Sequence, residues 1–220
     1  MESIKSVYSK NSKNPSSDKL ESLSYLERAF SFYASYHNNF VNQIIHIFCV
    51  WPILISSLLF LTYTPTFITI DPNIGPFLNS NFGLKFSPII DINFCLLTSL
   101  YYGIFYLIIE LPGVVGILSS LLVLISYHWV YYLNQMYPSS WKYGIIINVS
   151  CWVAQIFGHH AFEGRSPALL DNLYQAFVMA PLFVIMEVFF YFGYRPNFKS
   201  RIDKIVATNI AKFKSEKKSS

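Results

Sequence analysis

Residues 89–133 read IIDINFCLLTSLYYGIFYLIIELPGVVGILSSLLVLISYHWVYYL, two long apolar runs separated by Leu111-Pro112-Gly113. The runs Ile89–Ile109 and Pro112–Leu133 each have about the 20 residues that a helix needs to cross a bilayer. Pro112-Gly113 interrupts regular helix and favours a tight turn. The stretch therefore predicts two membrane helices paired as a helical hairpin.

Further apolar runs flank this pair, and they are Ile44–Tyr63, Tyr143–Phe157 and Leu173–Tyr194. The segment from Thr64 to Pro88 is rich in proline, which excludes a regular helix through it. Pro181 divides the last run and Glu187 lies within it, which favours a re-entrant or interfacial hairpin over another crossing. The predicted fold is therefore an all-α polytopic membrane bundle with about four spans and a C-terminal helical hairpin.

The composition agrees with a membrane protein. Charged residues make up 13% of the chain, against about 25% in soluble domains. The three cysteines are dispersed through apolar runs, which predicts reduced core residues rather than a disulfide framework. We expect residues 1–23 to form a polar basic N-terminal arm, residues 24–196 one membrane-embedded catalytic domain, and residues 197–220 a basic cytosolic tail.

Lysine and arginine are concentrated in the two tails, so by the positive-inside rule both tails and the loop with Arg165 face the cytosol. Two cytosolic tails require an even number of crossings, which favours four. A six-span alternative needs a crossing within the proline-rich segment, which is too polar and broken. Lys217-Lys218 matches a dilysine retrieval signal, and the alternative is a solvated basic tail. We expect a multi-pass protein of the endoplasmic reticulum membrane.

The histidines are the residues that point to chemistry. Under the four-span topology His37, His46, His159 and His160 collect on the cytosolic side together with Glu163. Imidazoles and a carboxylate at a membrane boundary indicate metal binding or proton handling, and these ligands suit iron(II) or zinc. The alternative is a set of interfacial histidines bonded to backbone or lipid headgroups.

Helix geometry limits how these residues can meet. His37 and His46 are nine residues apart, so they lie on opposite faces of one helix and reach one metal only if the helix breaks near Asn38-Asn39. His159 and Glu163 share a face if the helix continues past Gly158.

Other residues have simpler interpretations. His128 lies beside Trp129, Tyr131 and Tyr132, which is typical of an interfacial aromatic belt. Glu110 is interpreted as a solvated helix end. No glycine-rich phosphate loop or serine elbow is present, and five histidines are too few for the desaturase class with its three histidine clusters. The basic residues lack an aromatic platform, so no nucleic-acid partner is expected.

Two blocks of sequence carry a family resemblance: Tyr33–Asn38 (YASYHN) with Asn42, His46 and Pro52, and Gln155–His159 (QIFGH) with Phe162-Glu163, Arg165 and Ser166–Leu173 (SPALLDNL). They resemble the 2-hydroxy fatty acid dioxygenase family of fungi and plants, small membrane proteins of the endoplasmic reticulum. The resemblance covers roughly Ser24 to Pro196 and excludes both tails.

The resemblance implies an iron(II)-dependent dioxygenase of fatty acid α-oxidation. A 2-hydroxy long-chain fatty acid, such as one from phytosphingosine breakdown, would react with O2 and lose one carbon. The implied site residues are the iron ligands His37, His46 and His159, Glu163 as a fourth ligand or an orienting residue, and Asn42 and Arg165 for substrate. Arg165 has an alternative role as a positive-inside anchor.

A non-catalytic membrane scaffold that binds lipid, or a transporter, is the alternative function. It would account for the hydrophobicity and the basic tails but would leave the clustered histidines without a purpose. The sequence leaves the oligomeric state open.

Overall fold

The structure is a computed structural model that describes residues 23–70, 90–111, 113–164 and 172–219. Residues 1–22 of the predicted arm, residues 71–88 of the proline-rich segment and Pro112 of the predicted turn lie outside that description. The elements in chain order are α3 (Tyr25–Tyr36), α4 (Phe40–Leu61), β1 (Ile68–Ile70), β2 (Ile90–Ile92), α6 (Phe94–Glu110), α7 (Val114–Met136), α8 (Trp141–Gly158), the π-helical turns η1 (His159–Glu163) and η2 (Gln175–Met179), α9 (Ala180–Tyr191) and α10 (Pro196–Ser219).

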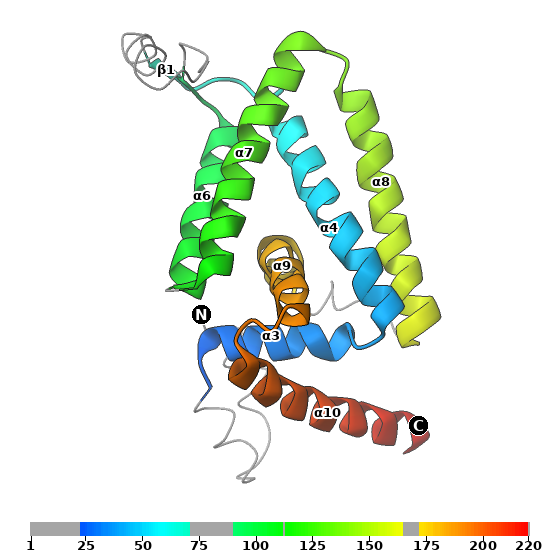
Figure 1. Cartoon of the computed structure of the whole chain (residues 1–220). Coiled ribbons are helices and arrows are strands. Elements are labelled where there is room, and N and C mark those ends of the chain that lie inside the picture. Colours follow the sequence, from blue (N-terminus) through cyan, green and yellow to red (C-terminus); the bar gives the residue numbers. More distant parts are fainter. Residues whose placement is uncertain (1–22, 71–89, 112, 165–171, 220) are drawn as a thin grey trace.

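Two antiparallel helix pairs, α4 with α8 and α6 with α7, form the sides of the bundle (Figure 1). They approach each other at one end, and α3 and α10 lie across the other end. Helix α9 occupies the space between the two pairs (Figure 1). The all-α bundle predicted from the apolar runs is confirmed, with one short antiparallel ribbon of β1 and β2 added.

Three helical segments of the described chain are long and apolar enough to cross a membrane. They are α4, α7 and the continuous segment of α8 and η1; a fourth exists only if the bent pair of α9 and α10 is one span. Helix α6 has 17 residues and is shorter than its predicted run. The reason is that Ile90–Ile92 pairs with Ile68–Ile70 as a strand, after which Asn93 caps the helix by accepting from the Leu96 amide at 3.0 Å.

Small and polar residues hold α4 against α8. A Cβ on Gly144 would lie 2.9 Å from the Phe60 ring, and one on Gly158 would lie 2.5 Å from Oδ1 of Asn42. Between these two points the Asn148 amide donates to Oγ of Ser56 at 2.9 Å. Close approach through small residues and side-chain hydrogen bonds are the usual means of pairing helices in lipid, where apolar burial gives no net gain.

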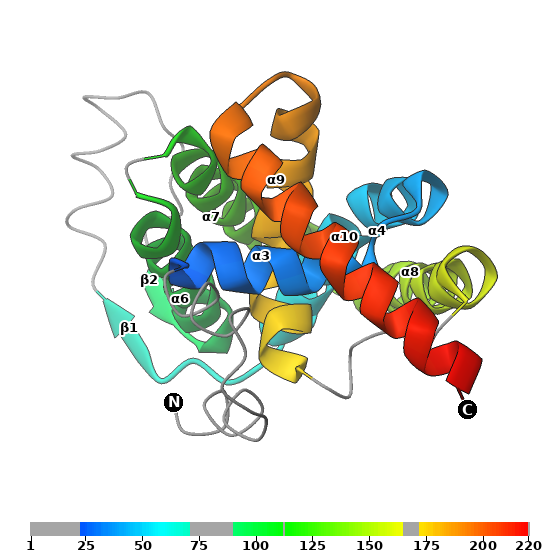
Figure 2. The same cartoon turned by 90° about the horizontal axis from the view of Figure 1, so that it is seen from below.

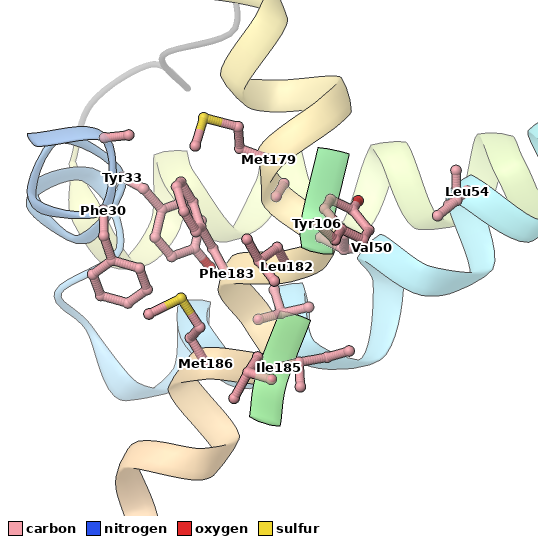
Figure 3. Close-up of a cluster of buried hydrophobic side chains, with 14 of the residues drawn as sticks. Phe30, Tyr33, Val50, Leu54, Tyr106, Met179, Leu182, Phe183, Ile185 and Met186 are labelled. Atoms are coloured by element: carbon pink, nitrogen blue, oxygen red, sulfur yellow. The ribbon is translucent and has the colours of Figure 1, made fainter. Parts of the chain in front are cut away.

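Helix α9 is buried on nearly all sides, as expected for a helix that is apolar all round. Its Leu182 and Phe183 are fully buried, and Figure 3 shows them between Tyr33 of α3 on one side and Val50 and Tyr106 on the other. This cluster joins α3 and both helix pairs into one core.

The last apolar run was predicted to break at Pro181, but the helix passes through it: η2 ends at Met179, α9 begins at Ala180, and Gln175–Tyr191 form one helix. Pro181 lies in the first turn of α9 and has no N–H to donate to the carbonyl of Phe177, four residues earlier. The Tyr102 hydroxyl donates to that carbonyl at 2.9 Å, and Tyr106 donates to the carbonyl of Val178 at 2.9 Å. Tyrosines of α6 therefore satisfy the backbone that the proline and the π-turn leave open.

The sharp bend follows α9, where the chain turns by 112° into α10. Gly193 and Arg195 adopt positive φ values of 81° and 45° at this elbow. Arg195 forms an ion pair with Glu110 at 3.2 Å, and the Tyr194 hydroxyl donates to the same carboxylate at 3.0 Å. Glu110 is completely buried, so its interpretation as a solvated helix end is wrong: the elbow covers it.

Residues 196–219, most of which were expected to form a tail, make up helix α10, which crosses α3 (Figure 2). Phe198, Ile202 and Val206 are buried and four residues apart, so they form one face of the helix. Arg201 donates to Glu27 of α3 at 2.7 Å. Burial raises the pKa of the Glu27 carboxyl, but hydrogen bonds from Ser24 and Arg201 outweigh burial and lower the pKa below its ordinary value of 4.5. The carboxylate therefore stays charged opposite Arg201.

The Glu110 pair gives a test of the elbow. Arg195→Met should destabilise the protein by about 2 kcal/mol, because it leaves a buried carboxylate without its counter-charge while part of the arginine's contribution is screened by solvent. Unfolding of the detergent-solubilised protein, followed by circular dichroism, measures the change. The double variant Glu110→Gln/Arg195→Met removes both charges and should recover part of the loss. A single variant as stable as wild type would contradict the role of the pair.

Candidate metal centre

A break between α3 and α4 forms one edge of the site. Helix α3 ends at Tyr36 with His37 as its C-cap, and Asn39 caps α4 by accepting from the Val41 amide at 2.9 Å. The carbonyl of His37 accepts from the Gln43 side chain at 2.8 Å. The helix therefore breaks between His37 and His46, as their nine-residue spacing requires if both are to reach one point.

Glu163 closes this break from the opposite side of the site. Its Oε1 accepts from the backbone amides of Asn38 and Asn39, both at 2.8 Å, and from the Asn42 side chain at 3.3 Å. These amides lie at the N-terminus of α4, where the helix dipole favours negative charge. The π-turn His159–Glu163 that ends α8 carries this carboxylate. One carboxylate side chain therefore ties the end of α8 to the start of α4.

His37, His46 and His159 are buried together at this point. Their ring centroids are 4.2 to 4.8 Å apart, and one candidate ligand atom from each lies within 4.8 Å of the other two. Nitrogens bound to one ion at about 2.1 Å lie roughly 3–4 Å apart, so small ring rotations suffice. The three histidines could therefore hold a metal ion.

Hydrogen bonds fix two of the rings. Nδ1 of His37 donates to the carbonyl of Tyr33 at 2.8 Å, and Nδ1 of His46 donates to the carbonyl of Asn42 at 2.9 Å. Each carbonyl lies four residues before its histidine, so the helix itself sets the tautomer. In these tautomers Nε2 carries the lone pair that can bind a metal, and such backbone partners are typical of metal-binding histidines.

Tyr33 links the cluster to the core of the bundle. Its ring stacks on His37 with centroids 4.0 Å apart, and its hydroxyl donates to the buried carboxyl group of Glu187 in α9 at 3.1 Å. Burial, with the nearby Glu187 adding to it, raises the pKa of the Tyr33 hydroxyl well above its ordinary value. Tyr33 therefore stays protonated and holds the His37 ring against α9.

A cavity of about 70 Å³ opens beside the three imidazoles. That is ample for several waters or a small polar group, since one water needs roughly 10–15 Å³ on the same measure. Trp152 and Gln155 of α8, Tyr33 and Tyr36 of α3, and Gln175 of η2 contribute to its wall. The lining is mostly apolar, and the histidines form one polar side of it.

The other residues singled out in the sequence are placed differently. Glu163 lies outside the set of converging ligand atoms and binds the backbone instead. Asn42 is fully buried, but its amide binds Glu163 and it does not line the cavity. His160 and His128 are exposed and outside the cluster. Arg165 lies outside the described residues.

Several features of the site were not predicted from the sequence. Gln155 and Gln175 line the cavity. Gln155 belongs to the QIFGH block and Gln175 follows the block that ends at Leu173, but neither was given a role. The turns η1 and η2 are π-helical, and both border the site. Such turns recur at functional sites, but their widened spacing leaves no simple mark in the hydrophobic pattern.

The fold and the site define an integral membrane helix bundle with a buried three-histidine centre. Comparison with known families shows more: the chain belongs to the Mpo1-like family, described as 2-hydroxy-palmitic acid dioxygenase Mpo1-like, whose model matches residues 23–192. It is also 28% identical over 183 residues to the 2-hydroxy-palmitic acid dioxygenase MPO1 of Saccharomyces cerevisiae, covering 83% of this chain and 90% of the yeast protein. No solved structure matches the chain significantly.

Alanine substitution of His37, His46 or His159 should each remove most metal from the purified protein, because two imidazoles leave the coordination sphere incomplete. Metal content by elemental mass spectrometry and retention of Co²⁺ after dialysis are the measurements. His128→Ala, on the exposed side of α7, is the control and should retain wild-type metal content. Equal losses in all four variants would contradict a centre made by the buried three.

Glu163 can be tested as ligand or orienter with two substitutions. Glu163→Gln keeps an Oε1 that accepts from the three amides, so an orienting Glu163 predicts metal content near wild type and about 1 kcal/mol lower stability from the lost charge. Glu163→Ala leaves the amides unsatisfied, so it should strongly reduce both the metal content and the stability of the protein. If Glu163→Gln lost its metal while its melting temperature stayed unchanged, Glu163 would be a ligand.

Proposed function

We propose that this protein is an iron(II)-dependent dioxygenase of fatty acid α-oxidation, which converts a 2-hydroxy long-chain fatty acid and O2 into the fatty acid one carbon shorter. The observation that carries the proposal is the buried cluster of His37, His46 and His159 in an apolar bundle of the Mpo1-like family. The name of the yeast relative supports the substrate class. A lipid scaffold or transporter would not need three convergent imidazoles.

The overall reaction balances without an external reductant. For 2-hydroxypalmitic acid, the acid and one O2 give pentadecanoic acid, CO2 and water. The bond between C1 and C2 breaks, C1 leaves as CO2 and C2 becomes the new carboxyl carbon. The substrate supplies four electrons, which fully reduce one O2, so no co-substrate such as 2-oxoglutarate is required.

The donor set fits a dication such as iron(II). His37, His46 and His159 would hold the ion and leave coordination positions open, and iron(II) would there supply the activation of O2. The ligands are neutral, so a bound dication keeps its charge within a mostly apolar wall. That charge favours an anionic substrate, whose carboxylate would compensate it.

The protein residues around the cluster orient the histidine rings and the backbone that carries them. The carbonyls of Tyr33 and Asn42 orient the two histidine rings, and we assign to Glu163 the role of an orienting residue that fixes the α3–α4 break. Asn42, expected to bind substrate, is better assigned to the same support because its amide contacts Glu163. Arg165 follows directly after the described part of this segment and remains our proposed partner for the substrate carboxylate.

We further propose that the protein resides in the endoplasmic reticulum membrane with both termini in the cytosol. The basic residues of both tails support this orientation, and Lys217-Lys218 supports the compartment. Helices α3 and α10 lie at one end of the bundle (Figure 1), and the position of His37 as the C-cap of α3 supports a metal centre at that end. The substrate would then enter from the cytosolic leaflet, with the spans holding the protein in the bilayer.

Purified protein supplied with iron(II) should consume O2 on addition of 2-hydroxypalmitate and release CO2 and pentadecanoate in equal amounts. An oxygen electrode and mass spectrometry of the extracted acids measure the ratio. Palmitate, which lacks the hydroxyl group, should give no oxygen consumption, and 2-oxoglutarate should not change the rate. Absence of turnover in a preparation that binds iron, or dependence on 2-oxoglutarate, would contradict the proposal.

A further inference from the structure

A second cavity adjoins the one at the histidines. Its walls come from α4, α6, α8, η2 and α9, and its α4 side is formed by Val50, Ile53, Leu54 and Ser57. Trp152, Gln155 and Ala176 line both cavities. These three side chains therefore lie between the two spaces.

The second cavity follows α4 away from the histidines. Val50, Leu54 and Ser57 are four and three residues apart, so they lie on one face of α4 over two turns, or roughly 10 Å. His46 lies four residues before Val50 on the same face. The cavity thus continues the line of the metal centre toward the middle of the span.

Two hydroxyl groups that line this cavity are hydrogen-bonded to backbone carbonyls, whereas the Gln155 amide nitrogen is bonded to none in the described chain. Ser57 donates to the carbonyl of Ile53 at 2.7 Å, and the Tyr102 hydroxyl donates to the carbonyl of Phe177 at 2.9 Å. Gln155 is 7% exposed, and its side-chain nitrogen has no hydrogen-bond partner among the described residues. A buried amide without a partner costs free energy that a ligand's oxygen would recover.

Gln155 also occupies the right position along α8. It lies four residues before His159 and so projects from the same helical face, one turn further into the bundle. A ligand that contacts the histidine cluster with its polar end and fills the apolar cavity with its tail must pass Gln155. A chain with a carboxylate and hydroxyl at one end and hydrocarbon beyond them has this distribution of polarity.

We propose, resting on the proposed function, that the second cavity holds the part of the acyl chain nearest the head group of the 2-hydroxy acid and that the Gln155 amide donates a hydrogen bond to the oxygens of that head group. The chain lies along α4 from Val50 toward Ser57. Gln155 is then a binding residue that fixes how far the head group enters the bundle. Ile53 and Leu54 line the space in which the acyl chain lies.

Photolabelling tests this placement without turnover. The probe is 2-hydroxypalmitate with a diazirine near the middle of its chain, bound to the full-length, iron-free protein in nanodiscs. Peptide mass spectrometry should find the label on Val50–Ser57 or Phe177, and excess 2-hydroxypalmitate should suppress it. Labelling confined to exposed bilayer-facing residues such as Phe48 and Ile146, unaffected by competitor, would overturn the proposal.

A matched pair of substitutions tests chain length. Ile53→Trp fills the cavity and should lower kcat/KM for 2-hydroxypalmitate relative to 2-hydroxyoctanoate by about tenfold or more, whereas Ile146→Trp on the exposed face of α8 should leave that ratio at its wild-type value. Ile53→Phe, a smaller increase, should shift the ratio in the same direction if the larger variant does not fold. An unchanged ratio in Ile53→Phe would overturn the assignment.

Gln155→Leu removes the donor at similar volume. It should weaken competition by 2-hydroxypalmitate for the photoprobe about tenfold on the iron-free protein, a loss that matches one hydrogen bond to a charged group. Gln135→Leu, at an exposed position on α7, is the control and should compete like wild type. Equal competition by the two variants would overturn the role of Gln155.

These outcomes separate the inference from the proposed function. If the protein consumes no O2 but the competed label lies on Val50–Ser57, the fatty acid cavity is supported and the dioxygenase proposal fails. If 2-hydroxypalmitate is turned over but the label lies elsewhere, the dioxygenase proposal is supported and the cavity assignment is overturned.

Discussion

The site depends on the carboxylate of Glu163 bound across the break between α3 and α4. Three imidazoles from three segments can meet only if α3 stops at His37 and α4 restarts in a new direction. Stopping a helix exposes amide groups that must be satisfied, and Oε1 of Glu163 accepts from those of Asn38 and Asn39. Because Glu163 ends the segment that begins with His159, the same contact draws the third imidazole toward the other two.

The order of the segments explains how much of this could be read from the sequence. The nine-residue spacing of His37 and His46 requires a break, because α-helix geometry leaves no other way for both to reach one ion. The apolar runs give the helices, because a bilayer needs about 20 residues in each. Both arguments use neighbours along the chain, and the structure agrees with both.

The expectations that were wrong involve partners far apart in sequence. Glu110 ends a helix at a turn, which indicates exposure, but Arg195 of the distant elbow covers it. The helix of the second run begins later than predicted, because Ile90–Ile92 pairs with a strand some twenty residues earlier. The bend expected at Pro181 comes after Tyr191, since tyrosines of α6 satisfy the backbone near the proline. Tertiary contacts decide each of these cases, and local patterns do not contain them.

Polar side chains inside an apolar bundle need hydrogen-bond partners. This rule distinguishes the polar residues that join helices from a residue that is available to a ligand. Asn148 binds serines of α4, Glu110 binds an arginine, and Glu187 accepts from Tyr33. These groups join helices to one another. The Gln155 side-chain nitrogen has no such partner in the described chain, although it lies between a polar centre at the end of the bundle and an apolar cavity within it. An amphipathic ligand that enters head last meets this gradient in the right order: its hydrocarbon chain gains apolar surroundings, its head group gains a donor and a metal centre, and the bundle gains the missing hydrogen bond.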